Sequence, residues 1–234
     1  MNSPLFEVGK IRLLNVPHAQ SLAEEVITED CYELAHLNKD WFLIDCGACY
    51  GEASLYAASL GAYAYALEPS DLSFAVLTSN VEINRDLPGM VIPCNRFVGV
   101  HKAIVEHYFW PHHPGGSGKS PCDKSIYRQM TAIGVDRLIK DALHKYGKHR
   151  KIAVKMDIEG SEVEAFKDCD VWLPKVEHIA LETHNFDNDA FAAHLERNGF
   201  EVKLSGTGKP PRVAWDRSMA GCLVVGRRKA HVQP

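Results

Sequence analysis

Residues 42–51 read FLIDCGACYG and join an apolar run to a run of small residues. The first part of this region, WFLID at 41–45, is short and apolar, which predicts a buried strand. Gly47 and Gly51 predict a tight turn, and EASLYAASLG at 52–61 predicts a helix of small residues. A strand, a glycine turn and a helix in this order are typical of the first ligand-binding unit of a doubly wound α/β fold.

The same alternation of strands and helices continues along the chain. Strands are predicted at 62–68, 89–94, 151–160, 176–184, 200–206 and 219–228. Helices are predicted at 70–84, 134–147, 187–199 and from residue 161 onward. Residues 97–110 are predicted to form a short hairpin or irregular strands, and residues 111–125 a loop. This pattern favours an α/β, Rossmann-like fold with a mostly parallel sheet and helices on both faces. Such a sheet binds its ligand at the carboxyl ends of its strands.

No linker or shift in composition divides the chain, so we expect a single domain overall. Within it, residues 41–234 should form the core. Residues 1–40 should form a helical segment packed on that core, with one or two short helices and Thr28 as an N-cap.

The composition is that of an ordinary globular domain. The chain has 234 residues, 46% of them hydrophobic, and a formal net charge of −4. No overall basic field exists to attract nucleic acid or an anionic membrane, so neither is expected as a partner. The start of the chain lacks the apolar core of a signal peptide, and the apolar run at 53–67 is too short to cross a bilayer. Seven cysteines in mostly apolar surroundings favour a reducing, cytoplasmic location.

A second glycine-bearing stretch, HHPGGSGKSP at 112–121, resembles a phosphate-binding loop. That motif requires a strand, then a glycine followed by four residues and Gly-Lys-Ser, then a helix. His113 occupies the position of the first glycine, and Pro111 interrupts any preceding strand. We therefore interpret the stretch as a substrate flap rather than as a nucleotide-hydrolase motif. If the flap folds over the site, His112 and His113 are alternative bases.

The first glycine turn better fits a nucleoside site. Asp45 lies at the tip of the first strand, and Gly47 and Gly51 allow the backbone to approach a ligand closely. Glu68, at the tip of the second strand, is placed to accept the hydroxyl groups of a ribose. The dinucleotide pattern G-x-G-x-x-G is absent, so adenosine with a small polar tail fits better than NAD. S-adenosylmethionine is such a ligand.

The sequence resembles the FkbM family of S-adenosylmethionine-dependent methyltransferases. The resemblance rests on EEVITEDCYEL (24–34), FLIDCGACYGEASLYAA (42–58), ALEPS (66–70), NVEIN (80–84), VDRLI (135–139), VKMDIEGSE (154–162), IALETH (179–184) and a final GF…V at 199–202. The block at 154–162 discriminates best, since the family pattern is K-x-D-x-E-G-x-E. The resemblance implies a class I methyltransferase fold with a seven-stranded sheet and methylation of a hydroxyl on a small molecule, sugar or natural product.

The motifs and the resemblance together assign cofactor binding to Asp45, Gly47, Ala48, Gly51, Glu68, Pro69, Asn95 and Asp157. Residues 97–110, the stretch 112–121 and residues 207–217 match nothing in the family pattern, so substrate identity should be set there. The acceptor and the oligomeric state stay open.

Three side chains should meet where the central strands end. Asp157 ends one strand, and Glu182 and His184 share a face of its neighbour. Lys155, inside the first of these strands, needs a carboxylate partner, for which Glu182 is one candidate. We expect catalysis from Asp157, Glu182 and His184, with His184 favoured as the base because imidazole titrates near neutrality. No metal is expected, although Asp157, Glu182 and His184 could hold a divalent ion.

Three alternatives remain at this stage. One is a nicotinamide-dependent oxidoreductase with the same kind of fold, and another is a methyltransferase-like binding module without activity. The third concerns Cys46 and Cys49, whose C-x-x-C spacing suits a redox dithiol or half of a zinc site.

Overall fold

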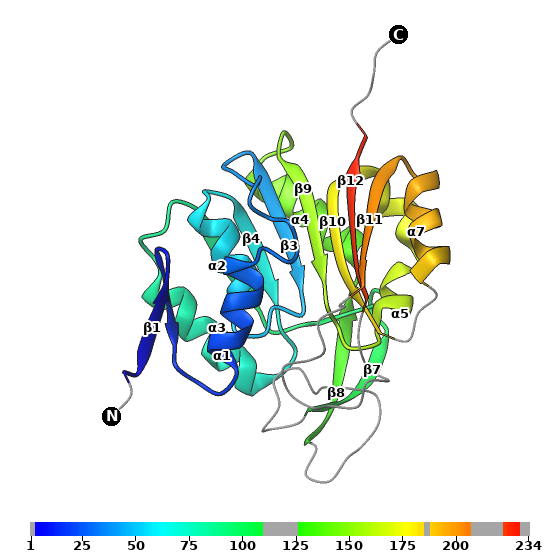
Figure 1. The fold of residues 1–234 in the computed structure, drawn as a ribbon. Helices are drawn as coiled ribbons and strands as arrows, with labels where there is room; N and C mark the ends of the chain where they lie inside the picture. Colours follow the sequence, from blue (N-terminus) through cyan, green and yellow to red (C-terminus); the bar gives the residue numbers. More distant parts are fainter. Residues whose placement is uncertain (1–2, 110–125, 185–187, 207–221, 230–234) are drawn as a thin grey trace.

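The computed structural model describes residues 3–109, 126–184, 188–206 and 222–229. Its main element is a seven-stranded sheet in the order β11-β12-β10-β9-β3-β4-β5 (Figure 1). The strands are β3 (Trp41–Cys46), β4 (Tyr63–Leu67), β5 (Met90–Cys94), β9 (Lys151–Met156), β10 (Val176–Thr183), β11 (Phe200–Gly206) and β12 (Cys222–Arg228). Neighbouring strands from β10 to β5 pair in parallel, and β12 runs antiparallel to both of its neighbours. The predicted mostly parallel sheet is thereby confirmed.

Helices cover both faces of this sheet, as predicted. They are α2 (Glu52–Ser59), α3 (Asp71–Ile83), α4 (Val135–Tyr146), α5 (Glu162–Phe166), α6 (Cys169–Trp172), the 3-10 turn η2 (Leu173–Lys175) and α7 (Asn188–Arg197). The central strand β3 shows how the faces divide. Phe42 and Ile44 pack with α4, α6 and α7, whereas Leu43 between them packs with α2 on the other side. All six residues of β3 are buried, which explains why every one of them except Asp45 is apolar.

The first forty residues differ from the predicted helical segment. They begin with a hairpin of β1 (Leu5–Val8) and β2 (Ile11–Leu14), followed by α1 (Ala19–Ala23) and a π-helical turn, η1 (Glu24–Thr28). Thr28 ends this turn and does not cap a helix start, so that prediction was wrong. The hairpin is anchored on α3, because the side chains of Asn84 and Asn80 accept hydrogen bonds from the backbone of Arg12 and Leu14. The division at residue 40 stays a prediction.

A small second sheet lies beyond the carboxyl ends of the parallel strands, around the labels β7 and β8 in Figure 1. It consists of β6 (Phe97–Val98), β7 (Ile104–Phe109) and β8 (Ile126–Ile133), in the order β6-β8-β7. Of the two forms predicted for residues 97–110, separate strands are present, whereas the hairpin is not, since β8 lies between β6 and β7 and pairs with both. Strand β8 was not predicted. The histidines at 112 and 113 and the loop around them lie outside the described residues.

Among the described residues, no helix combines the length and apolar character needed to cross a membrane.

Candidate functional site

A cavity of about 260 Å³ opens where β3, β4 and β9 end. One wall consists of the turns that follow these strands and includes Gly47, Glu68 and Asp157. The opposite wall comes from the small sheet and includes Phe97, and α1 closes a further side. The cavity therefore lies at the strand ends, where the doubly wound fold binds its ligands.

Gly47 places two of these turns in direct contact. Its φ of 76° lies in the left-handed region, and a Cβ at this position would meet the carbonyl oxygen of Asp157 at 1.8 Å. The turns are also joined by a hydrogen bond of 3.0 Å from the Asp157 N–H to the Cys46 carbonyl. Only glycine fits here, because another residue would push Asp157 away from the end of β3.

Two further residues of the glycine motif serve the packing of the turn. Gly51 has a φ of 97° and begins α2, and a Cβ there would lie 2.6 Å from a methyl group of Leu77. Ala48 is buried, and its N–H donates to the Leu67 carbonyl at 2.9 Å. Gly51 and Ala48 thus hold helix α2 and the turn close to β4 without lining the cavity.

Glu68 reaches the cavity from the tip of β4, as its position in the sequence predicted. Its carboxylate accepts hydrogen bonds from the N–H groups of Cys49, at 3.0 Å, and Ser70, at 2.8 Å. Burial raises the pKa of Glu68 to about 8, although both hydrogen bonds act to lower it. Pro69 also lines the cavity, and the amide of Asn95 donates to the Glu68 carbonyl at 3.2 Å. Asn95 therefore holds the strand tip that presents Glu68.

Asp45 lies behind the glycine turn and not in the cavity wall. It is fully buried, accepts a hydrogen bond from Ser54 at 2.7 Å and pairs with Lys155 at 3.4 Å. Lys155 also donates to the Gly47 carbonyl at 2.6 Å. Burial by itself lowers the pKa of Lys155, but the charges of Asp45 and Asp157 outweigh it and raise this pKa. The partner of Lys155 is thus Asp45, and the Glu182 alternative was wrong.

Acidic side chains surround His184 at the edge of the cavity. The Nδ1 atom of His184 lies 3.1 Å from the carboxylate of Glu162, and its Nε2 atom lies 3.6 Å from Glu159 and 4.0 Å from Glu182. Glu162 also accepts from the N–H groups of Ile158 and Gly160. Glu162 therefore holds both the turn after β9 and the imidazole at the end of β10 in place through hydrogen bonds.

This arrangement changes the expected charge of His184. Burial by itself lowers the pKa of His184, but the hydrogen bond to Glu162 and the charges of Asp157 and Glu159 outweigh burial and raise it to about 10. At neutral pH the imidazole is then already protonated and cannot accept a proton. The neighbours of His184 therefore weigh against it as the base, and the identity of the base stays a prediction.

Two carboxyl groups of the cluster titrate near neutrality instead. Burial, followed by the charge of Asp157, raises the pKa of Glu159 to about 8. The charge of Asp157, followed by burial, raises the pKa of Glu182 to about 8. Of these two, Glu159 lines the cavity. It also has a φ of 53°, a conformation that non-glycine residues adopt at a cost and that is enriched at functional sites.

The possible metal ligands also differ from those predicted. Donor atoms of Asp157, Glu159 and His184 lie within 4.8 Å of one another, so Glu159 takes the place given to Glu182. Two oxygens and one imidazole nitrogen suit several divalent ions.

Sequence reasoning missed several other cavity residues besides Glu159, and His18, Phe97 and His107 are among them. His18 comes from the start of α1, and Phe97 and His107 come from the small sheet. None of them belongs to a motif, so only the packing of distant segments brings them to the cavity. His112 and His113, predicted as flap residues, lie outside the described residues.

Comparison with known proteins decides the family. The model of the methyltransferase FkbM domain matches residues 45–202, which is more than half of the chain. The chain belongs to the FkbM family of methyltransferases. The predicted resemblance is confirmed, and methyl transfer takes precedence over the oxidoreductase alternative.

Two curated methyltransferases are similar to this chain over most of their length. Methyltransferase sdnD of Sordaria araneosa is 27% identical over 217 residues, which cover 79% of this chain and 83% of that protein. Methyltransferase 1 of Beauveria bassiana (strain ARSEF 2860) is 23% identical over 203 residues, covering 77% of this chain and 80% of that protein.

Solved structures share the class I methyltransferase fold. An FkbM methyltransferase from Methylobacillus flagellatus KT has a TM-score of 0.54 at 17% identity and covers 82% of this chain. The FkbM chain described here spans only 45% of that structure's length. A putative transferase from Pyrococcus horikoshii has a TM-score of 0.50 at 12% identity, covering 95% of this chain and 70% of that one.

Proposed function

We propose that this FkbM methyltransferase transfers a methyl group from S-adenosylmethionine to a hydroxyl oxygen of a small molecule. The observation that carries the proposal is the cavity at the ends of β3, β4 and β9. At one strand tip the cavity has Glu68, which we assign to accepting hydrogen bonds from the ribose hydroxyls. At another strand tip it has a cluster of carboxylates that includes Asp157 and Glu159.

Cavity residues from two strand tips suit two different parts of the cofactor. Glu68 would accept hydrogen bonds from the ribose hydroxyls, and Gly47 leaves room for the ligand to approach the backbone. Asp157 and its carboxylate neighbours provide the negative charge that a sulfonium favours. When bound, S-adenosylmethionine supplies an electrophilic methyl group on a good leaving group. The protein's main task is then to align the acceptor oxygen and remove its proton.

We assign proton removal to Glu159 in preference to His184. Glu159 lines the cavity, and its pKa of about 8 makes it a stronger base than an ordinary carboxylate. A bound sulfonium next to Asp157 would add positive charge, which favours the ionised form of Glu159. His184 would act as a cation that holds Glu159 and Glu162 in place. Glu182 does not line the cavity, and we assign it to setting the charge of the cluster.

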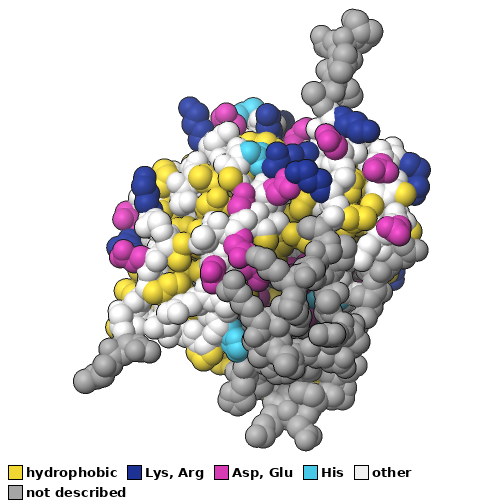
Figure 2. Space-filling model, viewed as in Figure 1, with side chains coloured by type: hydrophobic (Ala, Val, Ile, Leu, Met, Phe, Trp, Pro, Cys, Tyr) yellow, Lys and Arg dark blue, Asp and Glu magenta, His cyan; other side chains and the backbone are white. Residues whose placement is uncertain are grey.

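One face of the molecule favours a small acceptor over nucleic acid. On the face shown in Figure 2, Lys and Arg side chains are interspersed with Asp and Glu and form no continuous basic stripe. The small sheet that carries Phe97 and His107 would supply the acceptor side of the cavity. The described cysteines Cys31, Cys46, Cys49, Cys94 and Cys169 are free thiols, which agrees with work in a reducing compartment such as the cytoplasm.

Binding and activity measurements test the two halves of the proposal separately. In calorimetry, S-adenosylmethionine and S-adenosylhomocysteine should bind, and Glu68→Ala should weaken both by about 1–3 kcal/mol. Preference for NADH over both would instead favour the oxidoreductase. A screen of hydroxylated metabolites, measured by homocysteine release in a coupled assay, should identify the acceptor.

The same screen addresses the remaining alternatives. Cofactor binding with no turnover on any acceptor class would favour a binding module. Loss of turnover with a chelator, restored by a divalent ion, would assign proton removal to a metal held by Asp157, Glu159 and His184.

A further inference from the structure

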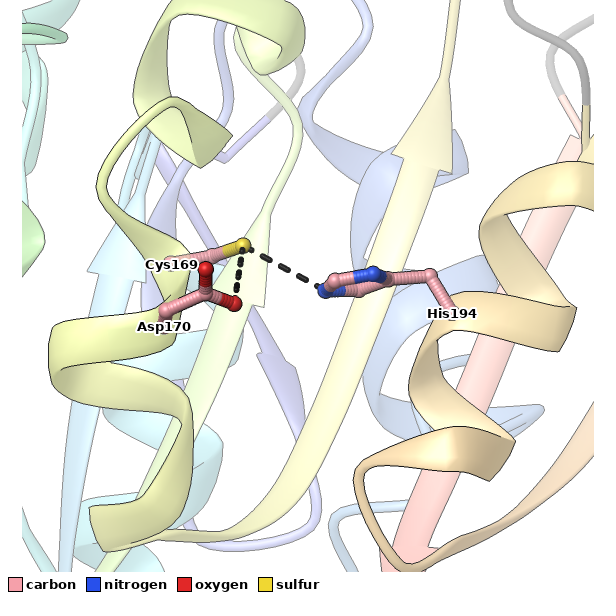
Figure 3. A group of neighbouring side chains, drawn as sticks. All are labelled: Cys169, Asp170 and His194. Carbon is pink, nitrogen blue, oxygen red and sulfur yellow. Dashed lines mark hydrogen bonds between the residues drawn. The ribbon is translucent and has the colours of Figure 1, made fainter.

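A second group of metal-binding side chains lies away from the cofactor cavity, between the helices on one face of the sheet. Cys169 and Asp170 begin α6, and His194 lies on α7. Figure 3 shows the three side chains pointing toward one another across the gap between these helices. None of the three lines the cavity.

The distances between the donor atoms match a coordination shell. The Cys169 Sγ atom lies 3.4 Å from His194 Nε2 and 3.9 Å from Asp170 Oδ1. Ligands at ordinary zinc–sulfur, zinc–nitrogen and zinc–oxygen bond lengths in a tetrahedron have sulfur about 3.6 Å from each of the other two atoms. All three donor atoms lie within 4.8 Å of one another. Small side-chain rotations are therefore enough to place one ion among them.

The imidazole is already in the form that binds a metal. Two groups approach its Nε2 atom, the thiol of Cys169 at 3.4 Å and the side-chain amide of Asn198 at 3.3 Å. The Asn198 amide nitrogen carries only hydrogens to donate, so Nε2 accepts from it and carries the lone pair. The single thiol hydrogen of Cys169 is directed to Asp170. A metal ion would replace the amide and the thiol as neighbours of Nε2. Asn198 would keep its other hydrogen bond, of 2.9 Å, to the His194 carbonyl.

We infer that Cys169, Asp170 and His194 form a zinc site that joins α6 to α7. One thiolate, one imidazole and one carboxylate are ligand types that zinc takes together. Cys169 is buried and Asp170 is exposed, so the fourth position faces water. Binding would release the thiol proton and form bonds from zinc to sulfur, nitrogen and oxygen, with no change in oxidation state.

A zinc ion at this site would stabilise the arrangement of Glu162 and His184 next to the cofactor cavity. Helix α5, which leads into α6, begins at Glu162, and α7 follows soon after His184. Zinc between α6 and α7 would therefore join the two chain segments that supply the Glu162–His184 pair.

Cobalt binding to the metal-free, tag-free full chain tests the inference. We expect about one equivalent of Co²⁺ to bind with a thiolate-to-cobalt charge-transfer absorption, and Zn²⁺ to displace it. Cys169→Ser should abolish this absorption. Asp170→Asn and His194→Gln should each weaken binding by at least about tenfold. A metal held by Asp157, Glu159 and His184 gives no thiolate absorption, so the two sites are distinguishable.

Two control variants complete the experiment. Asn198→Ala removes a neighbour of His194 that is not a ligand, and Cys94→Ser removes a free thiol elsewhere. Both should keep the absorption. If Cys169→Ser does not fold, the Asp170 and His194 variants decide the question. Absence of the thiolate absorption in the wild type, its loss in Cys94→Ser, or wild-type affinity in both the Asp170 and His194 variants would overturn the inference.

Discussion

Replacing Gly47 with alanine should separate the turns that form the cofactor cavity. The added Cβ would lie 1.8 Å from the Asp157 carbonyl oxygen, whereas real Cβ contacts essentially never fall below 3.0 Å. One of the two turns must therefore move by at least about 1.2 Å, the difference between these distances. That movement would carry Asp157 and the carboxylate cluster away from Glu68.

The expected cost has two parts. Placing alanine in the left-handed region costs about 1–2 kcal/mol. Overpacking two backbone segments costs about 1–3 kcal/mol more. Together they are a large part of the about 5–15 kcal/mol that stabilises a typical domain, so the variant should fold but be weakened. A displacement on the order of 1 Å at a catalytic site can lower turnover about 100-fold.

Two other glycines with positive φ serve as matched controls. Gly9, in the β1–β2 turn, and Gly160, after Glu159, have φ values of 59° and 89°, and a Cβ at either position would have no atom within 4 Å. Alanine at Gly9 or Gly160 should therefore cost only the backbone part. Urea unfolding and calorimetry with S-adenosylmethionine measure both effects. If Gly47→Ala loses no more stability and no more cofactor affinity than Gly9→Ala, the steric argument fails.

Three further predictions concern titratable groups. Between pH 6 and 9, affinity for S-adenosylmethionine should rise more steeply than affinity for S-adenosylhomocysteine, which lacks the sulfonium charge. The pKa values of Glu159 and Glu182 are raised to about 8, and their ionised forms attract the sulfonium; equal pH dependence of the two affinities in calorimetry would contradict this. Glu159→Gln should lower turnover by about 10²–10⁴ while cofactor affinity changes less than about tenfold, and wild-type turnover in this variant would exclude Glu159 as the base. Burial, followed by the charge of His36, lowers the pKa of His178 from 6.5 to about 4. The fold thus favours its neutral form, so His178 contributes stability that is complete above about pH 6.5 and is lost as the pH falls through 4, amounting to roughly 3 kcal/mol. Urea unfolding at several pH values should show this loss in the wild type and a smaller one in His178→Gln, and identical pH profiles would contradict the assignment.

The sequence alone was enough to predict the frame of the site. Strands buried on both faces read as continuous apolar runs, and the glycines between strand and helix mark where the backbone turns, so local pattern predicted β3, α2 and β4. Because parallel strands end at the same edge, the positions of Gly47, Glu68 and Asp157 predicted that they would meet. The strand order that places β9 between β3 and β10 followed from the same fold.

Only the tertiary structure decided which groups carry which charge. The partner of Lys155 depends on which carboxylate the neighbouring strand presents, and Asp45 is that group. The charge of His184 depends on Glu162 and Glu159, which lie more than twenty positions earlier in the chain. A local sequence pattern does not show that side chains so far apart in sequence are in contact. The wall formed by β6, β8 and β7 likewise depends on pairing between segments separated in sequence. A short motif determines backbone conformation through local sterics, whereas a pKa is the sum of burial and charges from every element nearby, and that sum exists only once the chain has folded.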